Sequence, residues 1–345
     1  MAIDVAVLRA KLIADTAQFQ SGMSRAQTQL SGFDKTANRT AKGLERGLFK
    51  VVKVGGVAAA AGLVYAAKKS MDFEKQMSAL GAVSNATAKD MGRFKTQAMK
   101  AGAATKFSAL DAAKAQTELA KGGLKIQQIM KGGLRSALSL AAAGELELAD
   151  AASTTVNAMK LFGIEGRKSG KVADALATAA NRTTADVADF ALALKQGGSA
   201  AKLAGMSFNG TVVALEALAE AGIKGSDAGT SLKAFLLNIA TPSKKAAEAM
   251  DELGFSIFDA SGNLKSLPGI AATLRKSFGD LTKEQFTQKA GIIAGSDAIR
   301  TLYSLYQAGP EKLKRLGKAT AEHGTALDVA RKKQDNFAGQ LERLQ

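Results

Sequence analysis

The sequence contains no cysteine and no tryptophan, and its 345 residues include one histidine and three prolines. Without cysteine there can be no disulfide, no thiolate nucleophile and no sulfur-ligated metal. A single histidine, His323, excludes His-rich zinc sites and most Ser-His triads. It lies in the polar stretch KATAEHGTALD, so we interpret it as a solvated surface residue rather than a general base. No paired-carboxylate motif stands out, and we predict that the protein is not an enzyme and has no catalytic, cofactor-binding or metal-binding residues.

The scarcity of proline and of aromatic residues favours helices. A proline inside a helix costs about 3 kcal/mol, so a chain with few prolines can form long uninterrupted helices. Alanine dominates the hydrophobic residues, and it is the strongest helix former although it buries little surface. We therefore predict a mainly α protein: a multi-helix domain of short antiparallel helices with a small β-hairpin, flanked by long N- and C-terminal helices.

The stretch VGGVAAAAGLVYAA at residues 54–67 has three possible interpretations. A Walker phosphate loop requires glycine followed by lysine and a hydroxyl residue, and no glycine of this run is followed by lysine. A membrane-spanning helix needs about 20 apolar residues, and this uncharged run has only 14 between Lys53 and Lys68. There remains a helix whose small residues four apart, such as Gly55 and Ala59, allow another helix to approach closely.

The formal net charge of +16 is unevenly distributed. Residues 1–70 carry an excess of +7, residues 71–309 of +6 and residues 310–345 of +3. The N-terminal segment is thus strongly basic, which favours an acidic surface, nucleic acid or anionic lipid as its partner. Solvated helix faces account for part of the same excess.

Three segments of different character follow from these patterns. Residues 1–70 form a basic segment with a short strand at 3–13 and helices that include the small-residue apolar run 54–67. Residues 71–309 form a helical core domain with a hairpin near 255–267, where a polar turn separates two apolar arms. Residues 310–345 form a charged helix that ends in mid-pattern without a C-cap, which suggests the start of a truncated rod.

Helix boundaries in the core are marked by caps. Ser108 is a predicted N-cap with Asp111 at the third position, and Thr282 with Gln285 forms a capping box. Thr183 is predicted to cap another helix, supported by an aspartate three residues later. Gly163 is predicted to end a helix.

Five sequence blocks follow one another in this core: DFEKQMSALGAVSNAT (72–87), ATKFSALDAAKAQTELAKGGL (104–124), LSLAAAGELELADAA (138–152), EAGIKGSDAGTSLKAFLLNIATPS (220–243) and FDASGNLKSLP (258–268). In this order they resemble the phage tail tape measure family, of the minor tail protein type, over about residues 70–310. Two features depart from the family. Its members are usually far longer, and Ala294-Gly295 stands where they tend to show Phe-Gly.

The resemblance implies a structural protein in the lumen of the phage tail tube, which nucleates tube assembly, fixes tail length and leaves during genome ejection. It implies as partners the tail tube protein, tail assembly chaperones and distal tail or baseplate proteins, in a homo-oligomer made in the host cytoplasm. Contact with DNA would be non-specific and contact with membrane transient. No cofactor is implied.

Two other classes of function compete with this interpretation. The run 54–67 beside basic residues suggests a membrane-active helical protein acting at the host envelope. The net charge alone suggests a nucleic-acid-binding protein, but the chain lacks the interleaved aromatic residues on which bases stack. A ruler, in contrast, needs only continuous helix, which advances about 1.5 Å per residue.

Overall fold

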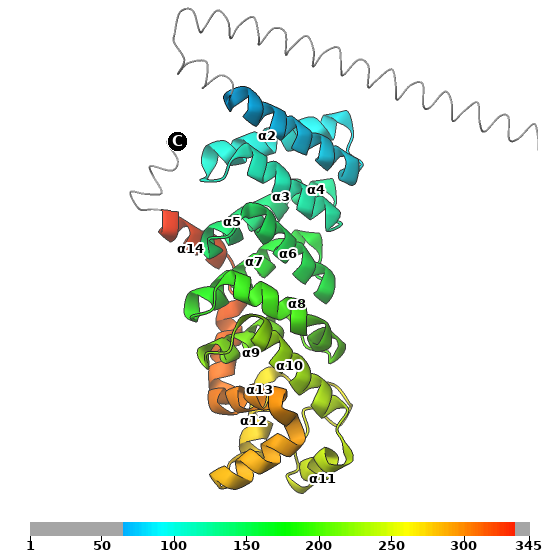
Figure 1. The fold of residues 1–345 in the computed structure, drawn as a ribbon, viewed down its shortest axis with the longest axis vertical. Coiled ribbons are helices and arrows are strands. Elements are labelled where there is room, and N and C mark those ends of the chain that lie inside the picture. The colour runs from blue at the N-terminus through cyan, green and yellow to red at the C-terminus, as the bar shows by residue number, and fades with distance from the viewer. Residues whose placement is uncertain (1–64, 335–345) are drawn as a thin grey trace, which may run out of the picture. The chain divides into compact units, whose positions relative to one another are not determined.

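The computed structural model describes residues 65–334, and nearly all of them are helical (Figure 1). The predicted strand at 3–13, most of the run 54–67 and the last residues, 335–345, lie outside the described part. The chain divides into two compact units, residues 1–71 and 72–345. Helices α2 to α14 all belong to the second unit.

The described residues confirm the mainly α fold class. A helical stretch at 72–84 opens the second unit. It is followed by α2 (Ala88–Ala104), α3 (Ala109–Lys121), α4 (Ile126–Gln128), the π-helical turn η1 (Ile129–Gly133), α5 (Leu134–Gly144), α6 (Leu148–Phe162), the 3-10 turn η2 (Gly166–Lys168), α7 (Ser169–Arg182), α8 (Val187–Leu203), α9 (Phe208–Glu220), α10 (Gly225–Ala240), α11 (Lys244–Glu252), α12 (Leu267–Phe278), α13 (Lys283–Thr320) and α14 (Thr325–Gln334).

Local capping explains where several of these helices begin and end. The hydroxyl of Ser108 accepts a hydrogen bond from the Asp111 amide, and the Asp111 carboxylate accepts one from the Ser108 amide. Thr282 and Gln285 form the same reciprocal pair at the start of α13. Helix α6 ends at Gly163, whose φ of 68° lies in the left-handed region that glycine tolerates best. These three predicted boundaries are confirmed.

The helices of the second unit stack mainly on near neighbours in the sequence (Figure 1). Helix α2 packs on α3, α3 on α6, α8 on α10, and both α10 and α12 on α13. Alanine and leucine line most of the shared core, and four fully buried phenylalanines are spread along it: Phe94, Phe190, Phe235 and Phe278. Each helix therefore buries its apolar face against a few partners only, as in other helical stacks.

Small residues bring α8 and α10 into backbone contact. A Cβ atom added at Gly197 would lie 2.6 Å from the carbonyl oxygen of Gly229, and one added at Gly229 would lie 2.3 Å from that of Ala193. Neither position has room for a side chain. The close packing expected of small-residue helices thus occurs in the core at this pair.

The predicted hairpin near 255–267 is wrong. No strand forms in residues 65–334, and the two arms share only an isolated antiparallel bridge between Phe258 and Leu264. The turn itself is present, because the Asp259 amide donates to the carbonyl of Asn263 at 2.9 Å.

Helices on both sides leave the arms too short for a strand. Helix α11 ends at Glu252 and α12 begins at Leu267. Within this gap the Ser256 hydroxyl accepts the Phe258 amide at 3.0 Å, and the Lys265 ammonium donates to the Ser256 carbonyl at 2.8 Å. Side chains therefore satisfy backbone groups that a ladder would use.

Two breaks divide helix α13 into three helical segments, here called legs. The backbone leaves helical angles at Gly295 (φ 75°, ψ 175°) and at Gly309 (φ 67°, ψ 169°). Both breaks are capped from other helices: Asn238 on α10 donates to the Ala294 carbonyl at 2.7 Å, and Arg275 on α12 donates to carbonyls before the second break. These side chains replace the helical partners that the breaks remove.

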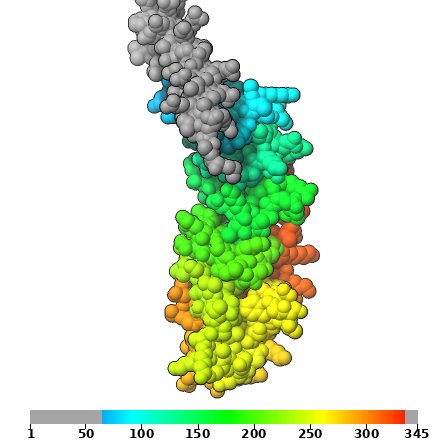
Figure 2. All heavy atoms as spheres, turned by 90° about the vertical axis from the view of Figure 1, so that its right-hand side faces the viewer, coloured from blue at the N-terminus to red at the C-terminus, as the bar shows by residue number. Residues whose placement is uncertain are grey.

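The single charged helix predicted from residue 310 onward is also wrong over its described part. Residues 310–320 form the last leg of α13, and α14 starts after a turn that contains Gly324 with φ 88°. Helix α14 packs on α5 and α7, so the red C-terminal segment lies beside green helices in Figure 2. The C-terminal part of the described chain therefore folds back on the core.

Candidate interaction surface and buried charges

Within residues 72–309 the excess of positive charge is concentrated in the first helices. Residues 72–144 contain eleven lysines and arginines against five acidic residues. Residues 145–309 contain seventeen of each. The excess of the core domain therefore lies on the part that forms α2 to α5, and a local surface rather than the whole domain is basic.

Two adjoining hollows lie on this basic part. One, of about 610 Å³, is lined by α2 residues from Lys89 to Lys100 and by Met130. The other, of about 370 Å³, lies between α2, α5 and α14. Gln97 and Lys100 line both hollows, which are here named together the basic groove.

The cations of the basic groove are mostly unpaired. Lys89, Lys100 and Arg135 are exposed and have no carboxylate partner among the described residues. Arg93 pairs with Asp90 on its own helix at 3.2 Å. The groove thus offers several cations to a partner, and a surface pair such as that of Arg93 contributes little to folding.

Glu216 on α9 is the most unusual charge of the described part. Its side chain is fully buried, and Arg182 at the end of α7 lies 3.2 Å from its Oε1 atom. This approach is not aligned as a hydrogen bond, and neither carboxylate oxygen accepts one within the described residues. One turn later, Glu220 pairs with Lys312 of α13 at 2.6 Å. The four charges connect α7, α9 and α13.

Burial raises the pKa of Glu216 to about 7, because the charged carboxylate loses its hydration. The cation of Arg182 lowers this pKa, the charge of Glu220 raises it and Lys312 lowers it. The group is therefore partly protonated near neutral pH. A perturbed carboxyl can mark a functional site, but structural ion-pair networks perturb pKa values as well, and the charges beside Glu216 form such a network with Arg182, Glu220 and Lys312.

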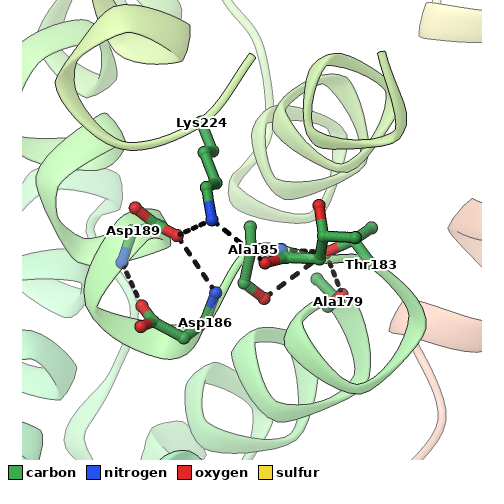
Figure 3. A network of polar contacts seen from close by, with 7 residues as sticks. Ala179, Thr183, Ala185, Asp186, Asp189 and Lys224 are labelled. Carbon is green, nitrogen blue, oxygen red and sulfur yellow. Dashed lines mark hydrogen bonds and ion pairs between the residues drawn. The ribbon is translucent and has the colours of Figure 1, made fainter. Parts of the chain in front are cut away.

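A second polar network joins the α7–α8 turn to the start of α10 (Figure 3). Asp186 accepts the Asp189 amide at 2.7 Å, and Lys224 lies 3.7 Å from the Asp189 carboxylate. The predicted cap at Thr183 is therefore wrong: Asp186 is the N-cap of α8, whereas the Thr183 hydroxyl donates to the Ala179 carbonyl at the end of α7. Thr183 is the C-cap residue of α7, which ends at Arg182.

His323 lies at the surface, with 65% of its side chain exposed, which confirms its interpretation as a solvated residue. Its Nδ1 is 4.0 Å from Asp174 of α7. That carboxylate accepts the amides of Gly324 at 2.9 Å and Ala326 at 3.0 Å, and so caps α14. In residues 65–334 no group of three acidic or histidine side chains is placed to hold a metal.

The sequence prediction named no site residue, and it did not find the basic groove. The excess of basic residues that marks the groove is present in the sequence, but counting charge over the whole segment 71–309 dilutes it with the balanced residues 145–309. Glu216 gave no signal, because VVALEALAEAG has the pattern of an amphipathic helix with a solvated glutamate. Its burial depends on α7 and α13, which come from distant parts of the chain.

Comparison with known proteins gives consistent matches. A family model described as phage-related minor tail protein matches residues 95–295. The "Tape measure protein" of Pneumococcus phage Dp-1 is 34% identical over 349 residues, covering 99% of this chain and 30% of that protein. The "Probable tape measure protein" of Escherichia phage P2 is 30% identical over 360 residues, covering 100% of this chain and 44% of that protein. No solved structure matches.

The helical fold and these relatives identify the class of protein as a structural component of a phage tail. The chain belongs to the phage tape measure family of the minor tail protein type, as the five sequence blocks predict. It spans less than half the length of each of the two curated relatives.

Proposed function

We propose that this chain acts as a tape measure in the lumen of the tail tube, where it nucleates tube assembly, contributes to setting tail length and leaves during genome ejection. The observation that carries the proposal is the identity over essentially the whole chain to two proteins named as tape measures. The proposal includes no enzymatic step.

The geometry of residues 72–334 supports a role in nucleation rather than in measuring length. A ruler converts residues into length at about 1.5 Å each only if its helix continues in one direction. The helices of residues 72–334 instead turn back on one another, so this unit adds little length per residue. We assign to it the nucleation of tube assembly, in contact with the tube protein, assembly chaperones and distal tail proteins.

The same stack suits a protein that has to leave the tube. Neighbour-to-neighbour packing gives a stability that is approximately a sum of local contributions, and such an array can open progressively. Interfaces rich in alanine bury little area per residue. We propose that the chain assembles as a homo-oligomer in the host cytoplasm and touches DNA only non-specifically.

The membrane-active alternative receives no support from the described residues. None of their helices combines the length and the apolar character that a bilayer crossing demands. The run 54–67, which suggested this alternative, lies mostly outside them.

Electron microscopy of phage tails tests the proposal. In a phage or prophage that encodes this chain, we expect in-frame deletion of residues 72–334 to give missing or irregular tubes, and expression of the intact gene in trans to restore them. Duplication of α9 and α10 should leave tail length almost unchanged, since these helices fold back on the stack. Normal numbers of tails with the deletion would refute a role in nucleation.

A further inference from the structure

We propose that the basic groove is a docking site for an acidic amphipathic helix of a partner protein. The inference goes beyond the proposed function, since it does not depend on where in the tail the chain lies. It rests on two features of the groove that occur together: an apolar floor and a rim of cations, of which Lys100 and Arg135 have no carboxylate partner among the described residues.

The floor belongs to the hollow between α2, α5 and α14. Its lining includes Phe107, Leu134, Leu138 and Leu327 together with several alanines. Leu327 is 37% exposed, and Phe107 and Leu138 are only partly buried. These side chains present apolar surface that the fold itself does not cover, and such surface marks a binding groove when polar residues surround it.

The rim places cations on both sides of this floor. Lys100 on α2 and Arg135 on α5 line the hollow and have no carboxylate partner among the described residues. Arg331 on α14 lies on the third wall, with Asp328 at the long distance of 4.0 Å. A helix that lays leucines on the floor and glutamates along its flanks would pair with these cations, in the helix-in-groove mode of recognition.

The apolar floor favours an amphipathic helix over nucleic acid as the ligand of the groove. A phosphate backbone has charge to offer but no apolar face, so it would leave Leu327 and Leu138 in water. Stacking of single-stranded bases needs aromatic platforms, and Phe107 is the one aromatic residue lining this hollow. An acidic amphipathic helix satisfies both the floor and the rim.

Fluorescence anisotropy with the full chain tests the inference. The probe is a fluorescein-labelled 18-residue helical peptide with leucines on one face and glutamates on its flanks. The matched peptide carries lysines in place of the glutamates. The test variant is Lys100→Glu with Arg135→Glu, and the control is Lys195→Glu with Lys233→Glu, which reverses two exposed lysines on α8 and α10 that have no ion pair in the described part.

We expect saturable binding of the acidic peptide, weakened about tenfold or more by the groove variant and less than about twofold by the control, since two attractions become repulsions. Leu327→Ala should weaken it about threefold, because it removes part of the floor. Circular dichroism confirms that each variant is folded.

Four outcomes would overturn the inference: no saturable binding, equal binding of the lysine peptide, an equal effect of the control variant, or no effect of Leu327→Ala. Displacement of the peptide by a 20-bp DNA duplex at lower concentration than by unlabelled peptide would identify the groove as a nucleic-acid site instead. Much tighter binding to a chain ending at residue 334 would identify residues 335–345 as the occupant.

Discussion

Arg275 on α12 donates a hydrogen bond from Nε to the backbone carbonyl of Tyr306 on α13, at 3.1 Å. Its Nη2 donates to the neighbouring carbonyl of Gln307, also at 3.1 Å. These carbonyls end the second leg of α13, where the break at Gly309 leaves them without helical partners. A Cβ atom at Gly309 would lie 2.3 Å from the guanidinium carbon, so glycine there lets the arginine reach its acceptors.

We predict that Arg275→Ala lowers the free energy of unfolding by about 1–2 kcal/mol, because two hydrogen bonds to a charged donor are lost at a partly solvated site. Arg275→Lys should recover little of this, since an ammonium cannot reproduce the two-donor fork. Urea denaturation followed by circular dichroism measures both. Lys276→Ala, on the next and exposed residue, is the control, and an equal loss there would contradict the capping role.

Asp174 should hold α14 on the stack. It accepts the amides of Gly324 and Ala326 from a helix 150 residues earlier in the chain. We expect Asp174→Ala to destabilise the fold by about 1–2 kcal/mol, as for loss of an N-cap, and to speed hydrogen exchange at the Ala326 amide. His323→Ala should change stability by less than about 0.5 kcal/mol, because that side chain is mostly exposed. A larger effect of the histidine than of the aspartate would refute this assignment.

The sequence predicts those boundaries of the fold that depend on neighbouring residues. Ser108 with Asp111 and Thr282 with Gln285 were found because both partners of each capping box lie within one turn. The breaks in α13 could not be found in this way. Ala294 and Tyr306 receive their hydrogen bonds from Asn238 and Arg275, which are 56 and 31 residues away.

The candidate site was less predictable for the same reason. Its cations come from α2, α5 and α14, and only the fold brings Lys100, Arg135 and Arg331 around one hollow. The prediction of one continuous helix from residue 310 also left α14 out of the site, since a continuous rod would carry Arg331 away from α5. Family membership was predictable because ordered sequence blocks do not depend on distant contacts.

Substitution by alanine should change the stability of the fold in opposite directions at two glycines of the stack, Gly229 and Gly291. Gly229→Ala would place Cβ 2.3 Å from the backbone oxygen of Ala193, and backbone cannot move aside as a side chain can. We expect a loss of at least about 2 kcal/mol. Gly291→Ala on α13 meets no atom within 4 Å and should stabilise by up to about 1 kcal/mol, because alanine is the better helix former. Thermal denaturation of both variants checks the sign, and similar shifts would contradict contact between α8 and α10.

Glu216 should make stability fall as pH rises toward neutrality. The folded pKa is about 7, against 4.5 for an ordinary solvated glutamate. Between these two values the folded protein holds a proton that the unfolded chain has released, so protonation stabilises the fold there. That stabilisation is complete below pH 4.5 and lost as pH rises through 7. The shift corresponds to about 3 kcal/mol at most.

The variant Glu216→Gln should remove this dependence, because its amide does not titrate. Other groups also respond to pH, so the quantity to measure is the stability of the variant relative to the native chain, by urea denaturation at pH 5 and at pH 8. We expect this difference to shift in favour of the variant by about 2–3 kcal/mol between the two pH values. The attraction to Arg182 is already contained in the folded pKa of Glu216, so its loss changes the stability of the variant equally at both pH values and leaves the shift unchanged. Glu220→Gln is the control, as its carboxylate is more exposed and paired with Lys312. A constant difference for Glu216→Gln would mean that the carboxyl is already charged at pH 5, despite its burial.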